Sequence, residues 1–229
     1  MDRAILNFLF QLDFGPVLSG SAEIMNPYKR EEVRKVCRSF YTKYYSDHSP
    51  RILIMGINPG RYGGGITGIP FTDPIRLEKD CEIPNPFYKK PETSSVFIYE
   101  MIDAFGGPSM FFSYFLVSAM SPLGFTSQGK NLNYYDHKDL YAETLPFITG
   151  SIRKQLAIPG IGNHTALCIG EGKNFKILKN LNQEFGFFKE VLPLPHPRYI
   201  MQYRYKRKQE YIQNYLEILK SVLKHVKIS

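Results

Sequence analysis

The chain alternates short apolar runs with longer amphipathic segments. Four runs have the length and composition of buried strands: residues 51–55, 112–119, 165–169 and 190–194. Five segments carry apolar residues at helical spacing: residues 29–45, 94–105, 139–156, 174–185 and 209–226. The last has one apolar stripe from Ile212 to Val226 with lysines opposite, which is typical of a helix packed on a core.

This order of elements predicts an α/β fold. Because strands and helices alternate, neighbouring strands should run parallel and be joined by right-handed crossovers. We therefore expect three layers, α/β/α, with a central four-stranded, mainly parallel sheet. A chain of 229 residues can bury one sizeable core, so we expect a single domain spanning residues 1–229.

An unusual segment follows each predicted strand. These segments read GINPGRYGGG, MSPLGF, GEGKN and PHPRY, and they begin at residues 56, 120, 170 and 195. In an open parallel sheet, ligands bind in the crevice outside the carboxyl ends of the strands. The pattern therefore places a site among these four segments.

Composition excludes several classes of protein. The chain has no uncharged apolar run of about 18 residues, as a membrane-spanning helix requires. Its start carries Asp2 and Asp13 without a signal-peptide cleavage pattern, so we expect a soluble, cytoplasmic protein. The cysteines, Cys37, Cys81 and Cys168, are odd in number and far apart, which indicates free thiols.

The charge of the chain is compatible with a polyanionic partner. The formal net charge is +8 and the pI is near 9.2, although many basic enzymes never bind nucleic acid. Between Arg198 and Lys208 there are five cations, no acids and three tyrosines. Charge alone would make this run a solvated helix start.

The glycines after the first strand formally match a dinucleotide-binding fingerprint. Gly63, Gly65 and Gly68 fit GxGxxG. That fingerprint needs a helix that begins within the glycines, whereas Pro70 and Pro74 predict a turn or an extended loop. The GEGKN segment lacks the Walker spacing and the Ser or Thr that binds magnesium. We therefore expect no nucleotide cofactor.

Two polar residues remain as candidates for chemistry. The five histidines show no metal-ligand spacing, and the chain has neither a GxSxG elbow nor a cysteine nucleophile motif, so we expect no metal and no covalent nucleophile. Asn58 alone would be typical of a turn, and His196 alone of a structural imidazole. Because both follow strands that end at the same crevice, together they indicate a site.

The segments around these residues carry a family resemblance. GINPG, followed by TGIPF so that Phe71 stands thirteen residues after Asn58, resembles motif 1 of the uracil-DNA glycosylase superfamily. It is most similar to the SMUG type (single-strand-selective monofunctional uracil-DNA glycosylase), whose pattern is close to GMNPG...TGVPF. LPHPR resembles the second motif, in which a His-Pro begins a loop that enters the duplex. The resemblance implies a uracil-DNA glycosylase-like fold and a divergent, bacterial branch of the SMUG group.

The resemblance also implies roles for the site residues. Asn58 would position the attacking water, where faster relatives carry an Asp. His196 would donate a hydrogen bond to the uracil O2 as negative charge develops, and Phe71 would stack on the flipped base. The bare backbone of Gly56 and Ile57 would approach the base closely.

Two positions bear on which bases are admitted. Relatives that exclude thymine carry a Tyr where this chain has Gly60, so the resemblance implies that 5-hydroxymethyluracil is admitted, although Tyr62 can still narrow the pocket. An Asn that reads the uracil edge in the SMUG group is replaced here by Ala119. The remaining candidates for edge reading are Ser118, backbone groups, and loop side chains such as Asn131 or Asn133.

The resemblance changes the interpretation of the basic run after His196. In the family, this loop fills the space left by the flipped base, and nearby cations hold phosphates. The wedge candidates are Arg198 and Tyr199, then Met201 and Gln202; the phosphate candidates are Arg204, Lys206 and Arg207. Phosphate contacts would make DNA affinity strongly salt-dependent.

Together these features predict a monofunctional DNA glycosylase. It would act as a monomer on uracil and related deaminated or oxidised bases in single- or double-stranded DNA, without a cofactor. It would leave an abasic site and no strand break, because neither motif contains a lysine that could form a Schiff base. The alternative is a non-catalytic nucleic-acid-binding protein on the same fold. A nucleotide-dependent enzyme is disfavoured by the missing helix.

Overall fold

A four-stranded parallel sheet forms the centre of the structure, a computed structural model that describes residues 1–15 and 18–224. The strands are β2 (Arg51–Gly56), β3 (Phe115–Ala119), β6 (Ile161–Ile169) and β7 (Glu190–Leu194), in the order β3-β2-β6-β7. All neighbours run parallel, so their carboxyl ends lie at one edge. The predicted parallel sheet is confirmed.

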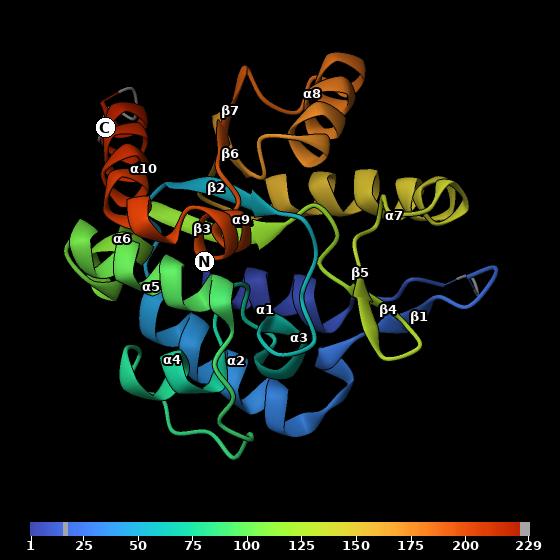
Figure 1. The fold of residues 1–229 in the computed structure, drawn as a ribbon, viewed down its shortest axis with the longest axis horizontal. Coiled ribbons are helices and arrows are strands. Elements are labelled where there is room, and N and C mark those ends of the chain that lie inside the picture. Colours follow the sequence, from blue (N-terminus) through green and yellow to red (C-terminus); the bar gives the residue numbers. More distant parts are fainter. Residues whose placement is uncertain (16–17, 225–229) are drawn as a thin grey trace.

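Helices cover both faces of this sheet, which confirms the three-layer α/β/α fold (Figure 1). On one face lie α5 (Thr93–Phe105) and α10 (Lys208–Leu223), where Ile98 and Leu219 face Ile54 of β2. On the other lie α7 (Lys138–Leu156) and α8 (Lys173–Phe185). Two further helices, α1 (Asp2–Phe10) and α2 (Glu31–Tyr45), pack on each other, and the Tyr45 hydroxyl donates to the Phe115 carbonyl of β3.

One predicted strand begins later than expected, because a helix occupies its start. The apolar run at 112–119 is divided between α6 (Pro108–Tyr114) and β3. Gly106 and Gly107, with φ of 124° and 89°, allow the chain to reverse sharply after α5. Pro108 then suits the first turn of a helix. The composition of the aromatic run predicts a strand throughout, but the sharp turn before it makes its first residues helical.

The expectation that no helix begins within the glycine segment is wrong. A single turn, α3 (Gly64–Thr67), forms there, and α4 (Pro74–Lys79) follows. Asp73 caps α4 by accepting hydrogen bonds from the backbone N–H groups of Ile75 and Arg76, both at 2.9 Å. The missing helix therefore no longer argues against a nucleotide, although α3 is only four residues long.

A second, smaller sheet and several short helices complete the described chain. The antiparallel strands are β1 (Glu23–Met25), β4 (Gly124–Ser127) and β5 (Lys130–Leu132), in the order β1-β4-β5. The short helices are η1 (Pro27–Lys29), α9 (Pro197–Tyr203) and η2 (Tyr205–Arg207). All five predicted long helices are present, though Val226 lies outside the described residues. Within the described ranges, no helix combines the length and apolar character needed to cross a membrane.

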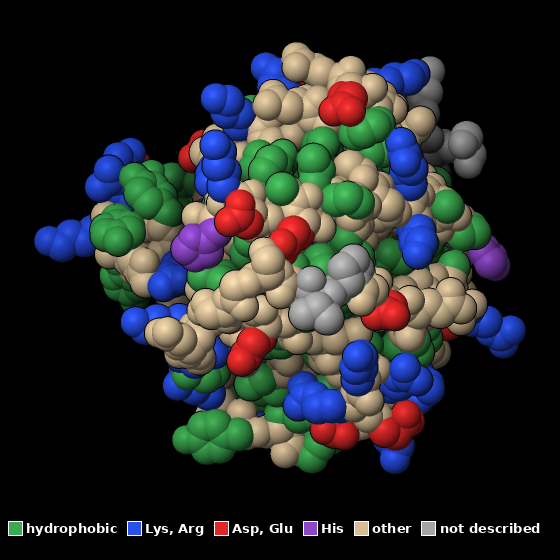
Figure 2. Space-filling model, turned by 90° about the vertical axis from the view of Figure 1, so that its right-hand side faces the viewer, with side chains coloured by type: hydrophobic (Ala, Val, Ile, Leu, Met, Phe, Trp, Pro, Cys, Tyr) green, Lys and Arg blue, Asp and Glu red, His purple; other side chains and the backbone are tan. Residues whose placement is uncertain are grey.

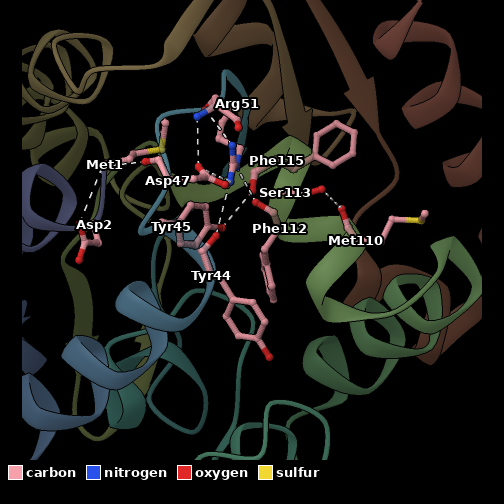
Figure 3. Close-up of polar contacts among 11 residues, drawn as sticks. Met1, Asp2, Tyr44, Tyr45, Asp47, Arg51, Met110, Phe112, Ser113 and Phe115 are labelled. Carbon is pink, nitrogen blue, oxygen red and sulfur yellow. Dashed lines mark hydrogen bonds and ion pairs between the residues drawn. The ribbon is translucent and has the colours of Figure 1, made fainter. Parts of the chain in front are cut away.

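Arg51 is a buried cation at the start of β2 (Figure 3). Its side chain is enclosed, and Nη2 lies 2.9 Å from both carboxylate oxygens of Asp47. Nε donates to the carbonyl of Phe112 at 2.6 Å and Nη1 to that of Ser49 at 2.7 Å. Because a buried charge is costly unless its donors are satisfied, this network fixes the end of α2, the start of β2 and α6 relative to one another.

Replacing Arg51 by Met should destabilise the fold by about 3–5 kcal/mol, because buried carbonyl groups would lose their charged donor. The melting temperature should fall by roughly 10 °C. Denaturant unfolding followed by circular dichroism measures the change. The control is Arg3→Met on the exposed face of α1. Equal losses of stability in the two variants would contradict an anchoring role for Arg51.

Candidate active site

A narrow pocket opens at the carboxyl edge of the sheet. It encloses about 90 Å³, well below the roughly 300 Å³ at which most ligand pockets begin, and so suits one small ring. The predicted base-site residues that line it are Gly56 at the end of β2, Ile57, Asn58 and Gly60 after it, Ser118 and Ala119 at the end of β3, and Phe71 and His196. Residues far apart in the sequence thus meet where the strand order predicts.

The carboxamide of Asn58 is held by the last residue of β5 and by the segment that follows it. Its Oδ1 accepts a hydrogen bond from the backbone N–H of Tyr134 at 3.0 Å, and its Nδ2 donates to the carbonyl of Leu132 at 3.0 Å. A carbonyl oxygen can accept two hydrogen bonds, so one lone pair of Oδ1 stays free. Asn58 can therefore hold a water through Oδ1 while the backbone fixes the orientation of the amide.

The ring of Phe71 lies directly against the backbone of Gly56. A Cβ at Gly56 would stand 2.8 Å from the ring, much closer than the roughly 3.5–4.0 Å at which carbon atoms pack. Phe71 has a φ of 52°, a conformation that costs a non-glycine residue about 1 kcal/mol or more. Its ring centroid lies 6.4 Å from that of His196. The close approach fixes an aromatic wall beside the histidine.

His196 is held in one tautomer by the start of α9. It is the N-cap residue of that helix, and its Nδ1 accepts a hydrogen bond from the backbone N–H of Arg198 at 3.1 Å. Burial, and then the charge of Arg198, lower the pKa of His196 to about 4. The ring is therefore neutral near pH 7, and because Nδ1 is an acceptor the proton lies on Nε2. The pocket has a hydrogen-bond donor of fixed direction.

Glu92 also lines the pocket and was missed from the sequence. It is the N-cap residue of α5, and its Oε2 accepts a hydrogen bond from the Ser95 hydroxyl at 2.8 Å. Burial, followed by the charge of Asp73, raises the pKa of Glu92, against the hydrogen bond from Ser95 and the charge of Arg198. The N-cap position of a helix favours Ser, Thr, Asp or Asn. Thr93, Ser94 and Ser95 follow Glu92 directly, so the sequence did signal that a helix starts here and that Glu92 lies at that start.

Three polar side chains lie near Ala119, which has no polar atom of its own to read a base edge. Ser118 is nearly buried, and its hydroxyl has no partner within the described ranges. Asn131 and Asn133 both line the pocket from the segment around β5. The Oδ1 of Asn131 accepts from the backbone N–H of Arg61 at 3.1 Å, whereas Nδ2 of Asn133 is bound to Asp136 at 3.2 Å.

Tyr62, expected to narrow the pocket, is not among the residues that line it. Two cations hold its ring instead: Lys90 Nζ lies 3.8 Å from the ring centroid and the Arg61 guanidinium carbon 4.6 Å from it. Such cation–π contacts favour a ring held against the two cations over one turned into the pocket. The side of the pocket at Gly60 is bounded by Glu92 and Asn131.

A wider groove of about 480 Å³ adjoins the pocket and shares His196 and Arg198 with it. Two predicted wedge residues, Tyr199 and Gln202, line this groove. Met201 does not, since it is half-buried and packs against the core. Three of the four wedge candidates therefore stand at the opening.

The predicted phosphate-binding residues lie along the same exposed segment. All three are exposed: Arg204 lies between α9 and η2, and Lys206 and Arg207 lie in η2. Arg204 stacks on the ring of Tyr199 at 5.4 Å, whereas Arg207 is already paired with Glu210 at 2.7 Å. Lysine and arginine side chains are also scattered widely over the face shown in Figure 2. The positions of the cations alone therefore do not identify a DNA-binding face. The segment from Arg198 to Arg207 differs from the rest in that its cations alternate with exposed tyrosines.

The structure gives the thiols no catalytic environment. All three cysteines are buried, and burial raises the pKa of Cys37 and Cys168 to about 12 and that of Cys81 to about 11. They are therefore protonated near neutral pH and poor nucleophiles. Among the described residues, no group of three or more His, Cys, Asp or Glu side chains could hold a metal ion.

Comparisons with known proteins agree with this geometry. Residues 42–220 match the profile of the Uracil DNA glycosylase superfamily. The crystal structure of wild-type SMUG2 from Pedobacter heparinus superposes with a TM-score of 0.94 at 46% identity, covering 97% of this chain and 98% of that one. A comparison with curated proteins gives no match. Matches of this extent confirm what two short motifs indicated: the chain belongs to the uracil-DNA glycosylase superfamily, as a SMUG-type member.

Proposed function

We propose that the protein is a monofunctional DNA glycosylase that removes uracil and related bases, including 5-hydroxymethyluracil, from DNA. The target nucleotide flips out of the DNA, its base enters the pocket, and hydrolysis leaves an abasic site. The observation that carries the proposal is the convergence of Asn58, Phe71 and His196 on one ring-sized pocket. Simple binding of DNA would require neither a fixed water-holding amide nor a fixed donor beside it.

The proposed reaction uses these groups in one displacement. A water held by Oδ1 of Asn58 attacks the sugar carbon C1′, the bond from C1′ to the base nitrogen breaks, and its electron pair leaves with the base. The proton lost by the water passes to solvent, and the departing base anion later takes one up. Because the transition state resembles an oxocarbenium ion, a weak nucleophile suffices. The Nε2–H of His196 stabilises the negative charge that develops at O2.

Two features support the finer parts of the proposal. Within the described residues, the pocket lining includes Arg198 but no lysine, and a lyase step needs an amine that can form a Schiff base. Gly60 stands where relatives that exclude thymine carry a Tyr, and the absence of that ring supports acceptance of 5-substituted uracils; Glu92 and Asn131 bound the pocket on this side. The proposal invokes neither a metal nor a cofactor, and it takes the protein as a monomer.

The DNA strand would run over the groove beside the pocket. Tyr199 and Gln202 would enter the space left by the flipped base, because they line that groove next to His196. Arg204 and Lys206 would hold phosphates, since both are exposed on the same segment. Arg207 would first have to exchange its ion pair with Glu210 for a phosphate.

Asn58→Ala should lower the single-turnover rate of uracil excision by about 100-fold or more, because the oxygen that positions the water is lost. DNA affinity should change little. The assay uses end-labelled oligonucleotides with one uracil or one 5-hydroxymethyluracil, and alkali reveals the abasic site. If the wild type binds both oligonucleotides but releases neither base, the non-catalytic binding protein replaces this proposal.

His196→Asn is designed to separate the two functions of the histidine. An Asn can still accept the Arg198 N–H as an N-cap, so the melting temperature should stay close to that of the wild type. The Asn side chain is shorter than that of His, so its Nδ2 donor does not reach the position of the histidine Nε2, which should lower the excision rate by about 10²–10³-fold. His196→Ala loses both functions and should show a lower melting temperature as well.

The pH dependence checks the same residue. With its pKa lowered to about 4, His196 is neutral in the folded protein at every pH above about 5. A plot of the excision rate against pH should therefore show no step from His196 near pH 6.5, the ordinary histidine pKa. Its contribution to stability is fully present above pH 6.5 and is lost as the pH falls toward 4. A rate step near pH 6.5 that disappears in His196→Asn would contradict the neutral donor.

Arg204→Ala should weaken DNA binding and reduce by about one the slope of log affinity against log salt, because one phosphate contact is removed. Fluorescence anisotropy at several salt concentrations measures the slope. The control is Lys220→Ala, an exposed lysine in the last turn of α10 and so distant from the carboxyl edge of the sheet. Equal slopes for Arg204→Ala and the wild type would rule out a phosphate contact at Arg204.

A further inference from the structure

The pocket must distinguish uracil from cytosine without a carboxamide at position 119. Hydroxyl groups cannot do this alone, because a serine hydroxyl both donates and accepts and so pairs with either base. Ser94 and Ser118 in the lining are of this kind. Discrimination therefore needs side chains whose polarity is fixed by other contacts.

Glu92 supplies a fixed acceptor. Its Oε2 is occupied by the Ser95 hydroxyl, whereas Oε1 has no donor within the described ranges. Oε1 lies only 3.1 Å from the point where a Cβ of Gly60 would stand, so the carboxyl group lies on the bare side of the glycine segment. An acceptor that has no protein donor and faces a pocket is available to a ligand.

Asn131 supplies a fixed donor beside it. Its Oδ1 accepts the backbone N–H of Arg61, which orients the amide and leaves Nδ2 toward the pocket. Nδ2 lies 3.4 Å from the same point at Gly60 that Oε1 of Glu92 approaches. An acceptor and a donor of fixed polarity therefore stand next to each other.

His196 supplies a second fixed donor, through Nε2–H, from the start of α9. Glu92 lies at the start of α5, which packs against α9, and it faces Asn131 on its other side. The three groups thus offer two donors and one acceptor to the same pocket. Each has one atom held within the protein and the other available to the pocket.

We propose that Glu92 is a specificity-determining residue that, between His196 and Asn131, reads the hydrogen-bonding edge of the base. Uracil presents O2, N3–H and O4, which are acceptor, donor and acceptor, and this order complements the three side chains. Cytosine presents an unprotonated N3 and an amino group, so its N3 lone pair would face Oε1 of Glu92 and its amino group would face the Asn131 donor. This assignment rests on the glycosylase function proposed above.

The protonation state of Glu92 is compatible with this assignment. A carboxylate would repel the negative charge that develops on the departing base, and burial and Asp73 raise the Glu92 pKa, against Ser95 and Arg198. A neutral carboxyl group can place its proton on Oε2, toward the Ser95 hydroxyl, and keep Oε1 as an acceptor. Both protonation states therefore offer an acceptor to N3–H.

The test compares Glu92→Gln with the wild type on matched oligonucleotides that carry uracil or cytosine at one position. A Gln amide can turn to present either its oxygen or its nitrogen, so it should no longer distinguish the two edges. We expect the ratio of uracil to cytosine excision to fall by about tenfold or more. Asn131→Ala, a change at an exposed residue, should lower the same ratio. Ser95→Ala loosens the hold on Glu92 but leaves Oε1 an acceptor, so it should lower the ratio less than Glu92→Gln does.

A second measurement separates this inference from the proposed function. Titration calorimetry of the free bases needs no catalysis: the wild type should bind uracil more tightly than cytosine, and Glu92→Gln should bind the two alike. An active wild type whose uracil-to-cytosine ratio is unchanged in Glu92→Gln would overturn the role of Glu92 and leave the glycosylase intact. If the wild type binds uracil more tightly than cytosine but releases no base, the proposed glycosylase activity is contradicted, whereas the proposed recognition of the base edge is supported.

Discussion

The pocket depends on one carboxamide. Asn58 follows β2 of the parallel sheet, and its two hydrogen bonds go to the backbone on either side of residue 133, which follows the small antiparallel sheet. The bonds therefore join two sheets that do not otherwise share a strand pairing within the described chain. They also bring Asn131 and Asn133 to the rim of the pocket. A residue that the motif marks as catalytic thus also holds the opposite wall in place.

This double use explains why an amide suits position 58 in this chain. The Leu132 carbonyl needs a donor and the Tyr134 N–H needs an acceptor, and a carboxamide offers the two from separate atoms of one planar group. A carboxylate would place an acceptor against the Leu132 carbonyl, where it would lose a hydrogen bond and add repulsion. An amide is a much weaker general base than a carboxylate. This is consistent with the proposed hydrolysis through an oxocarbenium-like transition state, because positioning the water matters more there than removing its proton.

The sequence could predict what depends on local pattern and strand order. The four strands and the meeting of Asn58 with His196 follow from apolar runs and from parallel pairing, which places all carboxyl ends together. The small sheet was not predictable, because β1 and β5 have three residues each and gain their stability from pairing with β4. Glu92 and Tyr62 were missed or misplaced for a related reason: contacts with distant residues, Gly60 and Lys90, decide their positions.

The groups proposed to face the base are held in the same way. Nδ1 of His196 accepts a hydrogen bond from a backbone N–H, Oδ1 of Asn131 accepts one from another, and Oε2 of Glu92 accepts one from a neighbouring hydroxyl. Each local bond fixes the side chain and, through the second atom, the polarity that it offers to a ligand. Two of the three are N-cap residues, where the start of a helix supplies the holding group. A rigid pattern of donors and acceptors can thus be built without the strand-end carboxamide, which is why Ala119 need not mean a loss of base recognition.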